Sequence, residues 1–474
     1  MKIKSRKTKS SLVLGLLLVI SCSGVRANIS LPAIFGNHMV MQQNAEVKLW
    51  GWGKPLEGVK VKTSWSADTL HTVVTQNGNW SVSLQTPSAG ETHEIAIQGY
   101  NKVEIKDVLM GEVWLCSGQS NMEWSVDHGI INGEEAAREA ENNEIRLFHV
   151  VWKSSPYPCI DLDGQWVKCT PETMRPFSAI GYFFGKELNK KLNCPVGLIS
   201  SNWGGTPIEA WIPEYEIRSR KKLNDAANKL PHFAWAPNEV AYTYNAMIAP
   251  LLPFSIKGVL WYQGEANVDN AYVYTDMLEL LVKTWRDKFN TEFDFYYAQI
   301  APFMHYQNDD GVKVRDAQRR ALDRISNSAM VVLSDIGDTT DIHPRKKIDA
   351  GKRFAQVALN KTYGYEEYPV SGPLFKDYLI KENKIEVLFD YSDGLYCSDK
   401  KLTMFELAGE DLQWYPAKAV IKQGKVVVSS GKVSRPVHVR FAWTNAATPN
   451  LFNKYNLPAS GFTTLEWRNV KHSL

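Results

Sequence analysis

The first part of the chain, from about residue 28 to 107, alternates apolar and polar positions with a period of two. This pattern, which is typical of strands with one buried face, occurs in residues 47–49, 59–61 and 94–97. Asn77-Gly78 stands between the strand-like segments 72–75 and 80–82, and this dipeptide favours a tight hairpin. Short strands joined by such turns predict a small β-sandwich domain over residues 28–107.

Between about residues 108 and 365 the pattern changes to apolar runs that alternate with segments of helical period. The strand-like runs are residues 108–115, 145–150, 196–200, 258–261, 293–300 and 330–333. Ile180, Phe184 and Leu188 recur at four-residue spacing, as on the buried face of a helix. Further helices are expected over 271–289 and 314–325 and from Pro344 onward. Alternating strands and helices predict a mostly parallel sheet with helices on both faces, which is a three-layer α/β/α domain.

From about residue 366 to 474 the period of two returns. The alternating segments are residues 384–389, 425–429 and 437–441. Turns that contain glycine or proline separate them, and this arrangement predicts a second β-sandwich domain.

Composition narrows the classes of function open to the chain. Its 474 residues are 44% hydrophobic and 22% charged, which is ordinary for globular protein. The formal net charge of +3 gives no reason to expect a nucleic acid or an anionic membrane as a partner. The 16 Trp and 20 Tyr suit a protein that handles sugars, although most of them are expected to fill the cores.

Residues 1–27 have the pattern of an export signal peptide. Five basic residues precede an apolar run over 12–20 that is too short to span a bilayer. Cleavage after Ala27 would give a secreted protein, in the bacterial periplasm or outside the cell. The alternative is a lipobox-like site that leaves a lipid anchor on Cys22, as in an outer-membrane lipoprotein. No later segment is apolar enough to predict a transmembrane span.

The cysteine and histidine patterns do not indicate a metal or a cofactor. Apart from Cys22, five cysteines remain, and an odd number cannot all pair with one another. Cys159 and Cys169 are close enough in sequence to form a disulfide in an oxidising compartment. The chain lacks H-E-x-x-H and paired cysteine spacings, and it also lacks G-x-x-x-x-G-K-[ST] and G-x-G-x-x-G. We therefore expect neither bound zinc nor a nucleotide cofactor.

Four polar stretches follow predicted strands of the middle domain. They are Ser117-Gly-Gln-Ser-Asn-Met122, Ser201-Asn-Trp-Gly-Gly-Thr-Pro-Ile-Glu-Ala-Trp211, Trp261-Tyr-Gln-Gly-Glu-Ala-Asn267 and Asp335-Ile-Gly-Asp-Thr-Thr-Asp-Ile-His-Pro344. Ligands of open α/β sheets bind at the carboxyl ends of the strands. If the strands are parallel, the four stretches gather at one edge of the sheet and form a candidate active site.

Ser120 and His343 carry the complementary chemistry of nucleophilic catalysis. A serine hydroxyl is a poor nucleophile until a base removes its proton, and an imidazole takes that proton and returns it to the leaving alcohol. An aspartate beside the histidine would fix the tautomer of the ring. The structural alternatives are a helix-capping serine and an ordinary loop histidine. Ser120 is not in G-x-S-x-G, because Met122 occupies the last position, and this argues against an α/β-hydrolase.

The two middle stretches would supply hydrogen-bond donors to an oxyanion. Gly204-Gly205 lets backbone N–H groups approach a ligand closely, and the amide of Gln263 or Asn267 adds a side-chain donor. The structural alternatives are a simple Gly-Gly turn and an ion pair between Glu265 and an arginine. The coincidence of four such stretches at four strand ends favours serine acyl transfer.

The stretches resemble the sequence blocks of the sialate O-acetylesterase family, which belongs to the SGNH hydrolases. The matching blocks are Gly118-Gln-Ser-Asn-Met122, Asn202-Trp-Gly-Gly-Thr-Pro-Ile-Glu-Ala-Trp211, Trp261-Tyr-Gln-Gly-Glu265 and Asp341-Ile-His-Pro344. The resemblance covers roughly residues 28–467. It implies a flavodoxin-like α/β/α fold and a carbohydrate esterase that removes acetyl groups from sugar hydroxyls without a cofactor. It also implies Ser120 as the nucleophile, His343 as the base, and Gly204 or Gly205 with Gln263 as oxyanion donors.

The chain departs from the SGNH pattern at the acid that orients the histidine. Many SGNH enzymes place an aspartate three residues before the histidine, where this chain has Thr340. We choose Asp341, two residues before His343; Asp338, or a Ser–His dyad helped by a backbone carbonyl, are the alternatives. Asn267 is a weaker match to the SGNH asparagine than Gln263 is to its own block.

The expected substrate is an acetylated sugar, with 9-O-acetylated sialic acids first. The alternatives are acetylxylan or another acetylated glycan and, in a different class, a carbohydrate-binding protein on an inactive esterase scaffold. Substrate contacts are predicted for Gln119, Asn121, Trp124, Trp211, Tyr262 and Glu265. Trp211 is equally well explained as a core residue, and Gln119 and Asn121 as residues that hold the turn around Ser120.

Overall fold

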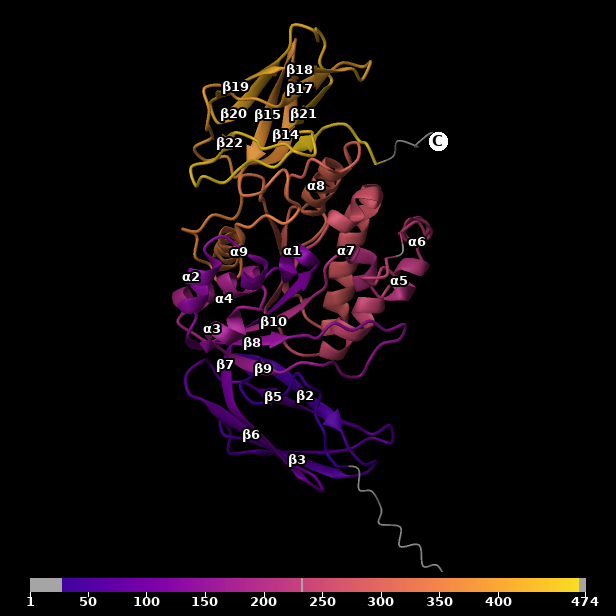
Figure 1. Ribbon diagram of the computed structural model, residues 1–474, viewed down its shortest axis with the longest axis vertical. Coiled ribbons are helices and arrows are strands. Elements are labelled where there is room, and N and C mark those ends of the chain that lie inside the picture. The colour runs from indigo at the N-terminus through magenta and orange to yellow at the C-terminus, as the bar shows by residue number, and fades with distance from the viewer. Residues whose placement is uncertain (1–27, 232, 469–474) are drawn as a thin grey trace, which may run out of the picture.

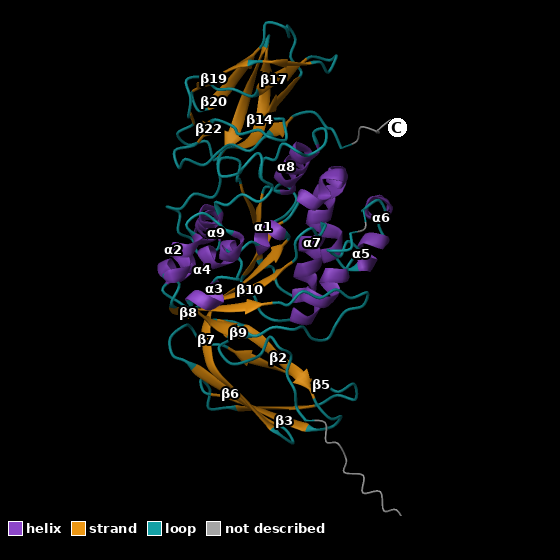
Figure 2. Cartoon of the chain, viewed as in Figure 1, coloured by secondary structure: helices purple, strands orange, loops and turns teal. Residues whose placement is uncertain are grey.

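The computed structural model describes residues 28–231 and 233–468. The predicted export signal, with Cys22 and both cleavage sites, lies outside the described residues. Three regions follow one another along the molecule: a β-rich N-terminal region, a central α/β region and a β-rich C-terminal region (Figure 1). Helices are concentrated in the central region (Figure 2). Within the described ranges, no helix combines the length and apolarity needed to cross a membrane.

The N-terminal region is built mostly from antiparallel pairs of strands. Its strands are β1 (Val40–Gln42), β2 (Glu46–Trp52), β3 (Gly58–Thr63), β4 (Thr69–Val73), β5 (Asn79–Gln85), β6 (His93–Gln98) and β7 (Lys102–Gly118). β2 pairs with β5, and β3 pairs with β4 and β6. The predicted turn forms, since the Gly78 N–H donates to the Thr75 carbonyl at 3.0 Å. The predicted hairpin is wrong, however, because β4 and β5 leave the turn toward different partners.

Strand β7 joins the N-terminal region to the central one. Its first half pairs antiparallel with β6, and its second half lies between two parallel strands of the central sheet. The strand therefore passes without a break through the boundary predicted between residues 107 and 108. One continuous cluster of buried apolar side chains extends from the N-terminal region into the central region.

The parallel strands of the central sheet all end at the same edge. The strands in spatial order are β13 (Ser328–Val331), β12 (Asp294–Ala298), β11 (Gly258–Tyr262), β7, β10 (Val196–Asn202), β8 (Asn142–His149) and β9 (Trp166–Cys169). All neighbours are parallel except β8 and β9. Every residue of β10 and β11 is buried, as expected for strands covered on both faces.

Helices pack on both faces of this sheet. They are α1 (Ser120–Glu123), α2 (Gly133–Arg138), α3 (Pro171–Met174), α4 (Ala179–Leu192), α5 (Glu214–Arg218), α6 (Lys221–Ala227), α7 (Ala271–Phe289), α8 (Asp310–Ala321) and α9 (Lys347–Lys361). Short 3-10 or π segments are η1 (Val126–His128), η2 (Ile208–Trp211), η3 (Tyr244–Ile248), η4 (Ala249–Leu251) and η5 (Glu265–Asn270). Trp114 of β7 contacts Phe184 of α4, whereas Trp261, on the opposite face, contacts Trp285 of α7.

Helix α9 begins at Lys347, whereas the sequence pattern predicted a start at Pro344. Residues 341–346 form a loop instead, in which the Asp341 carboxylate accepts a hydrogen bond from the His343 backbone N–H at 2.9 Å. This side-chain bond competes with helical hydrogen bonding and delays the start of the helix.

The C-terminal region contains two four-stranded antiparallel sheets around a separate apolar cluster. Its strands are β14 (Leu374–Lys381), β15 (Lys384–Asp390), β16 (Tyr396–Cys397), β17 (Phe405–Ala408), β18 (Trp414–Pro416), β19 (Lys418–Lys422), β20 (Lys425–Ser429), β21 (His438–Phe441), β22 (Leu451–Phe452) and β23 (Phe462–Thr463). The sheets have the orders β14-β15-β20-β19 and β18-β17-β21-β23. The apolar cluster between them includes Phe405, Phe441 and Phe462.

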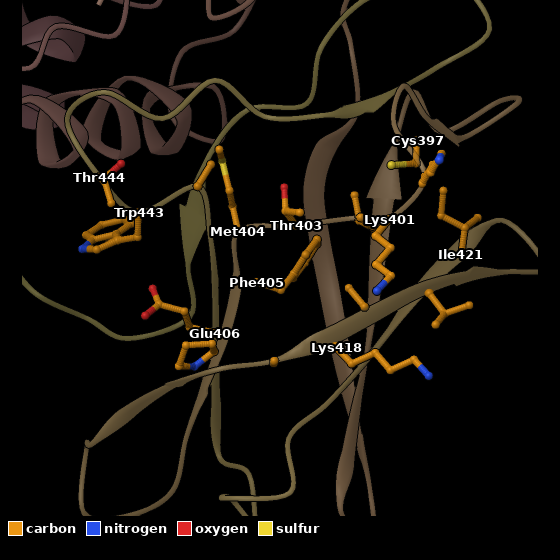
Figure 3. A pocket seen from close by; sticks show the side chains of 17 residues that line it. Cys397, Lys401, Thr403, Met404, Phe405, Glu406, Lys418, Ile421, Trp443 and Thr444 are labelled. Atoms are coloured by element: carbon orange, nitrogen blue, oxygen red, sulfur yellow. The ribbon is translucent and has the colours of Figure 1, made fainter.

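A cavity of about 1080 Å³ opens in this C-terminal region, with Met404, Phe405 and Lys418 in its wall (Figure 3). All of its lining residues lie between 397 and 444. The cavity therefore belongs to the C-terminal region and not to the carboxyl edge of the central sheet.

The five cysteines in the described ranges are all free, so the predicted bridge between Cys159 and Cys169 is wrong. Cys169 is buried at the end of β9 and its Sγ donates to the Ala140 carbonyl at 2.9 Å. Cys159 lies in the surface segment that follows β8 and contacts a different part of the chain. Closeness in sequence did not translate into closeness of the two sulfur atoms, because a strand and its loop separate them.

Candidate active site

The carboxyl ends of β10, β7 and β11 are level with one another. Gly118 lies opposite Asn202 on one side and Tyr262 on the other. Beyond this level, backbone hydrogen bonds continue to join the loops: Gln119 N–H donates to the Tyr262 carbonyl at 3.0 Å, and Trp203 N–H donates to the Gly118 carbonyl at 3.1 Å. Three of the four predicted polar stretches therefore meet at one edge.

Ser120 stands at the start of α1, directly after a turn that requires glycine. Gly118 has φ +134°, and a Cβ atom on it would overlap the backbone carbonyl of Tyr262. The Gln119 side-chain oxygen accepts hydrogen bonds from the N–H groups of Gly264 and Ala266, at 3.3 and 3.2 Å. Gln119 is buried and holds the turn, so the prediction that it contacts substrate is replaced by its structural alternative.

The fourth polar stretch positions His343 next to Ser120. The His343 Nε2 atom lies 2.9 Å from Ser120 Oγ, within hydrogen-bond distance. The ring is held from behind by Trp124, which stacks on it with centroids 4.6 Å apart and planes 18° apart. Burial, and then the charge of Lys347, hold the pKa of His343 below its usual value. A neutral imidazole beside the hydroxyl is the arrangement that a general base needs.

Asp341 lies beside His343 but does not hydrogen-bond to its ring. One oxygen of its carboxylate is 3.9 Å from His343 Nδ1, and the same oxygen accepts the backbone N–H of His343 at 2.9 Å. Asp338 points elsewhere, since its carboxylate accepts hydrogen bonds from the backbone and hydroxyl of Thr340. Asp341 therefore positions the loop and raises the pKa of the imidazole by its charge, whereas Asp338 shapes its own turn.

Gly204 adjoins the serine on the side of β10. A Cβ on Gly204 would lie 3.3 Å from the Ser120 Cβ, and the Gly204 N–H donates to the Glu123 carboxylate at 2.6 Å. This backbone N–H therefore already holds a carboxylate oxygen close to the nucleophile. Burial raises the pKa of Glu123. Sequence reasoning missed Glu123, although its place three residues after Ser120 on the same short helix was a signal.

Comparison with known proteins identifies the family. Residues 110–360 match the family described as "carbohydrate esterase, sialic acid-specific acetylesterase". The chain belongs to this carbohydrate esterase family. It is 29% identical to a sialate O-acetylesterase of Homo sapiens over 480 residues, which cover 91% of each chain. It is 28% identical to a sialate O-acetylesterase of Mus musculus, over 86% of this chain and 88% of the relative.

A solved structure agrees with the sequence comparison. A carbohydrate acetylesterase from Xanthomonas citri is 32% identical, with a TM-score of 0.85 over 93% of this chain and all of the other. The chain is therefore a carbohydrate O-acetylesterase, that is, a hydrolase of carboxylic esters, with an SGNH-like α/β region and additional β-rich regions.

In this esterase a network of buried polar side chains adjoins the pair formed by Ser120 and His343. Lys347 Nζ donates to the Asn121 side-chain oxygen at 2.5 Å, and Asn121 Nδ2 donates to Glu265 at 2.6 Å and to the Ile342 carbonyl at 3.0 Å. Lys347 also lies over the rings of Trp124 and Tyr262. Asn121 thus joins the helix of Ser120 directly to Ile342, the residue that precedes His343.

Burial shifts the pKa values of the two ionisable groups in this network. It lowers the pKa of Lys347 to about 7, against the opposing effect of Glu265, and it raises the pKa of Glu265 to about 7. Sequence reasoning missed Lys347, because its approach to Asn121 depends on the path of the loop over residues 341–346 and not on a helical spacing. Asn121 and Glu265 are buried parts of this support, and their contact with substrate stays a prediction.

The predicted side-chain oxyanion donors, Gln263 and Asn267, lie among other buried polar groups. Both are buried and their amides are already used: Gln263 Nε2 donates to Asn267 Oδ1 at 2.6 Å, and Asn267 Nδ2 donates to the Glu209 carboxylate at 2.7 Å. Asn267 Oδ1 also accepts the Ile208 N–H at 2.9 Å. The loop after β10 carries the buried Glu209. The amides of Gln263 and Asn267 satisfy the hydrogen-bonding groups of this loop.

Two of the predicted sugar-facing aromatic residues, Trp211 and Tyr262, are core residues. Trp211 is fully buried against Trp261, and its Nε1 donates to the Thr206 hydroxyl at 2.9 Å. Tyr262 is buried at the end of β11. Trp124 is the exception, since it is partly exposed and touches His343. Within the described ranges, no cluster of His, Cys, Asp or Glu is arranged to hold a metal ion.

The charge of Asp341 and its backbone hydrogen bond are separable by mutation. We expect Asp341→Asn to lower kcat by about tenfold, well short of the ~10⁴-fold loss for an aspartate hydrogen-bonded to the histidine ring. Asn can still accept the His343 N–H, so Asp341→Ala should lose several-fold more activity. Steady-state hydrolysis of an aryl acetate measures both variants. A loss in Asp341→Asn as large as that in His343→Ala would contradict this geometry.

The pH dependence of kcat/KM should report the environment of His343. Attack requires the neutral imidazole, and burial and Lys347 lower its pKa, so the acid limb should lie below the ordinary histidine value of about 6.5. Lys347→Met removes one lowering charge, so the acid limb should move up toward that value. Lys346→Met is the matched control, because Lys346 is exposed. The same acid limb in both variants would show that Lys347 does not act on His343.

Proposed function

We propose that this chain hydrolyses O-acetyl esters of sugars with Ser120 as the nucleophile and His343 as the general base. The observation that carries the proposal is the 2.9 Å approach of Ser120 Oγ to His343 Nε2 at the carboxyl edge of the sheet. Asp341 serves as the acid beside the histidine. The relatives named sialate O-acetylesterases favour 9-O-acetylated sialic acids as the first substrates to test.

In the proposed reaction the Ser120 hydroxyl attacks the acetyl carbonyl while its proton passes to His343. The oxyanion of the tetrahedral intermediate is held by the backbone N–H groups of Ser120 and of Gly204 or Gly205. One such donor typically stabilises the transition state by about 3 kcal/mol. Glu123 now accepts the Gly204 N–H, so this carboxylate gives way when the substrate binds. His343 then protonates the leaving sugar alcohol, and water attacks the acetyl-enzyme with the same base.

We also propose the finer architecture. The order of the central sheet and the helices on its two faces support a flavodoxin-like three-layer α/β/α domain over 108–365. The antiparallel strand pairs on either side support β-sandwich domains over 28–107 and 366–474. The N-terminal sequence supports export from the cytoplasm, and mass spectrometry of the exported protein would distinguish a start at Asn28 from a lipid-modified Cys22.

Release of acetate from a panel of defined substrates tests the proposed function. The panel contains 9-O-acetylated N-acetylneuraminic acid, acetylated xylo-oligosaccharides and an aryl acetate as a general ester. Preference for the sialic acid supports the proposal, and preference for the xylo-oligosaccharides favours an acetylxylan esterase. Absence of acetate release from all three would identify a carbohydrate-binding protein on an inactive scaffold and would overturn the proposal.

A further inference from the structure

Two tryptophans form a rigid pair beside the nucleophile. Trp152 follows β8 and Trp203 follows β10, and their rings are parallel, with centroids 5.4 Å apart and planes 7° apart. Trp152 Nε1 donates to the Asn202 carbonyl at 3.0 Å, and the Trp203 N–H donates to the Gly118 carbonyl. The Trp152 indole is therefore held by a hydrogen bond and by stacking on Trp203, whose backbone is tied to the turn before Ser120. Trp152 nevertheless keeps 49% of its surface exposed.

The two tryptophans follow Ser120 in order along the edge of the sheet. The strands run in the order β7, β10, β8, so Ser120, Trp203 and Trp152 follow three neighbouring strand ends (Figure 1). Adjacent strands are about 4.8 Å apart, which places the base of the Trp152 loop roughly 10 Å from that of the serine. Gly204, which adjoins Ser120, directly follows Trp203 in the chain. The Trp152–Trp203 pair therefore adjoins the proposed site of acetyl transfer at Ser120.

A second aromatic group borders the same turn. A Cβ on Gly205 would overlap the ring of Trp235, so this indole lies directly over the Gly204-Gly205 turn. Trp235 is 64% exposed and stacks on Phe233, which is 43% exposed, with ring centroids 5.3 Å apart. Exposed aromatic side chains therefore lie on both sides of the Gly204-Gly205 turn.

We propose that Trp152, backed by Trp203, is a binding subsite that stacks on a sugar ring of the substrate other than the acetylated one. The C–H face of a pyranose ring is apolar and flat, and it matches an exposed, immobile indole face. Lys153, the next residue in the chain, lies 3.7 Å from Asp163, which offsets its charge. The substrate would then be an acetylated sugar within an oligosaccharide chain. This inference rests on the proposed function, which it makes more specific.

Binding to an inactive form separates the subsite from catalysis. Ser120→Ala protein is titrated calorimetrically with two unacetylated probes, xylohexaose and sialyllactose, with and without Trp152→Ala. The dissociation constant for at least one probe should rise by about threefold to tenfold in the double variant. Trp152→Phe, which keeps an aromatic face, should restore most of the affinity. Tyr455→Ala, an exposed aromatic residue of the C-terminal region, is the matched control and should change nothing.

The outcomes distinguish this inference from the proposed function. Equal affinity with and without Trp152, or no binding of either probe by the Ser120→Ala protein, would overturn the subsite. Absence of acetate release from acetylated sugars by the unmodified protein would instead overturn the proposed function, whatever the titrations show. Circular dichroism of each variant checks that a change in affinity does not come from unfolding. If the Trp152→Ala protein unfolds, the Trp152→Phe titration decides. Loss of affinity in Trp152→Phe, which retains an aromatic ring, would then count against stacking.

Discussion

Replacement of Ser120 by alanine is expected to lower kcat toward an aryl acetate by at least about 10⁴-fold, because no other group can form the acetyl-enzyme. The hydroxyl lies 2.9 Å from His343 Nε2, and its removal leaves the base with no proton to take. Some activity above that of water should persist, since the backbone N–H groups that would hold the oxyanion are unchanged. The measurement is the initial rate of nitrophenol release at saturating substrate.

Ser117 offers the matched control for this substitution. It lies three residues earlier, near the end of β7, is buried, and its hydroxyl has no hydrogen-bond partner among the described residues. Ser117→Ala should therefore keep kcat within about twofold, since it removes a hydroxyl that contacts neither His343 nor the turn. Near wild-type kcat in a folded Ser120→Ala protein would refute Ser120 as the nucleophile.

The meeting of Ser120 and His343 could be predicted from sequence because it follows from topology. Parallel strands end at one edge, so residues 223 positions apart come together once the strand pattern has been read correctly. Gly118 was predictable for a similar reason, since a tight turn after a buried strand favours glycine. These inferences need only the backbone path and the chemistry of single residues.

The roles of the amide and acidic side chains could not be predicted in the same way. Gln263 and Asn267 have the chemistry of oxyanion donors, but the buried Glu209 uses the Asn267 amide. Asn121 likewise has the chemistry of a substrate contact but is enclosed between Lys347 and Glu265. Partner choice among buried polar groups depends on which of them the fold encloses together, and a local sequence pattern does not record this.

The same distinction explains the position of Asp341. Its spacing before His343 made it a candidate for the ring-orienting acid, but spacing does not determine whether a carboxylate faces the ring or the backbone. In the structure it bonds the backbone N–H of His343 and stays 3.9 Å from Nδ1. The ring is held in addition by stacking on Trp124, which reduces the need for a carboxylate hydrogen bond.

Substitution of Gly118 by alanine should be among the most damaging single changes in the chain. Gly118 has φ +134°, and the added Cβ would overlap the Tyr262 backbone carbonyl, which cannot move without displacing β11. Backbone strain and overpacking together should lower the free energy of unfolding by about 3 kcal/mol. Because Ser120 follows two residues later, the same displacement should move its hydroxyl from His343 and lower kcat by at least about a hundredfold.

Urea unfolding followed by tryptophan fluorescence, with the aryl acetate assay on the folded protein, measures both effects. Gly36→Ala is the matched control, since a Cβ at that position meets no atom within 4 Å and its φ is not in the left-handed region. It should leave the unfolding midpoint and the activity nearly unchanged. A Gly118→Ala protein with the midpoint and activity of the Gly36→Ala control would show that the sheet edge yields to an extra methyl group. The rigidity of the turn would then not explain how Ser120 is positioned.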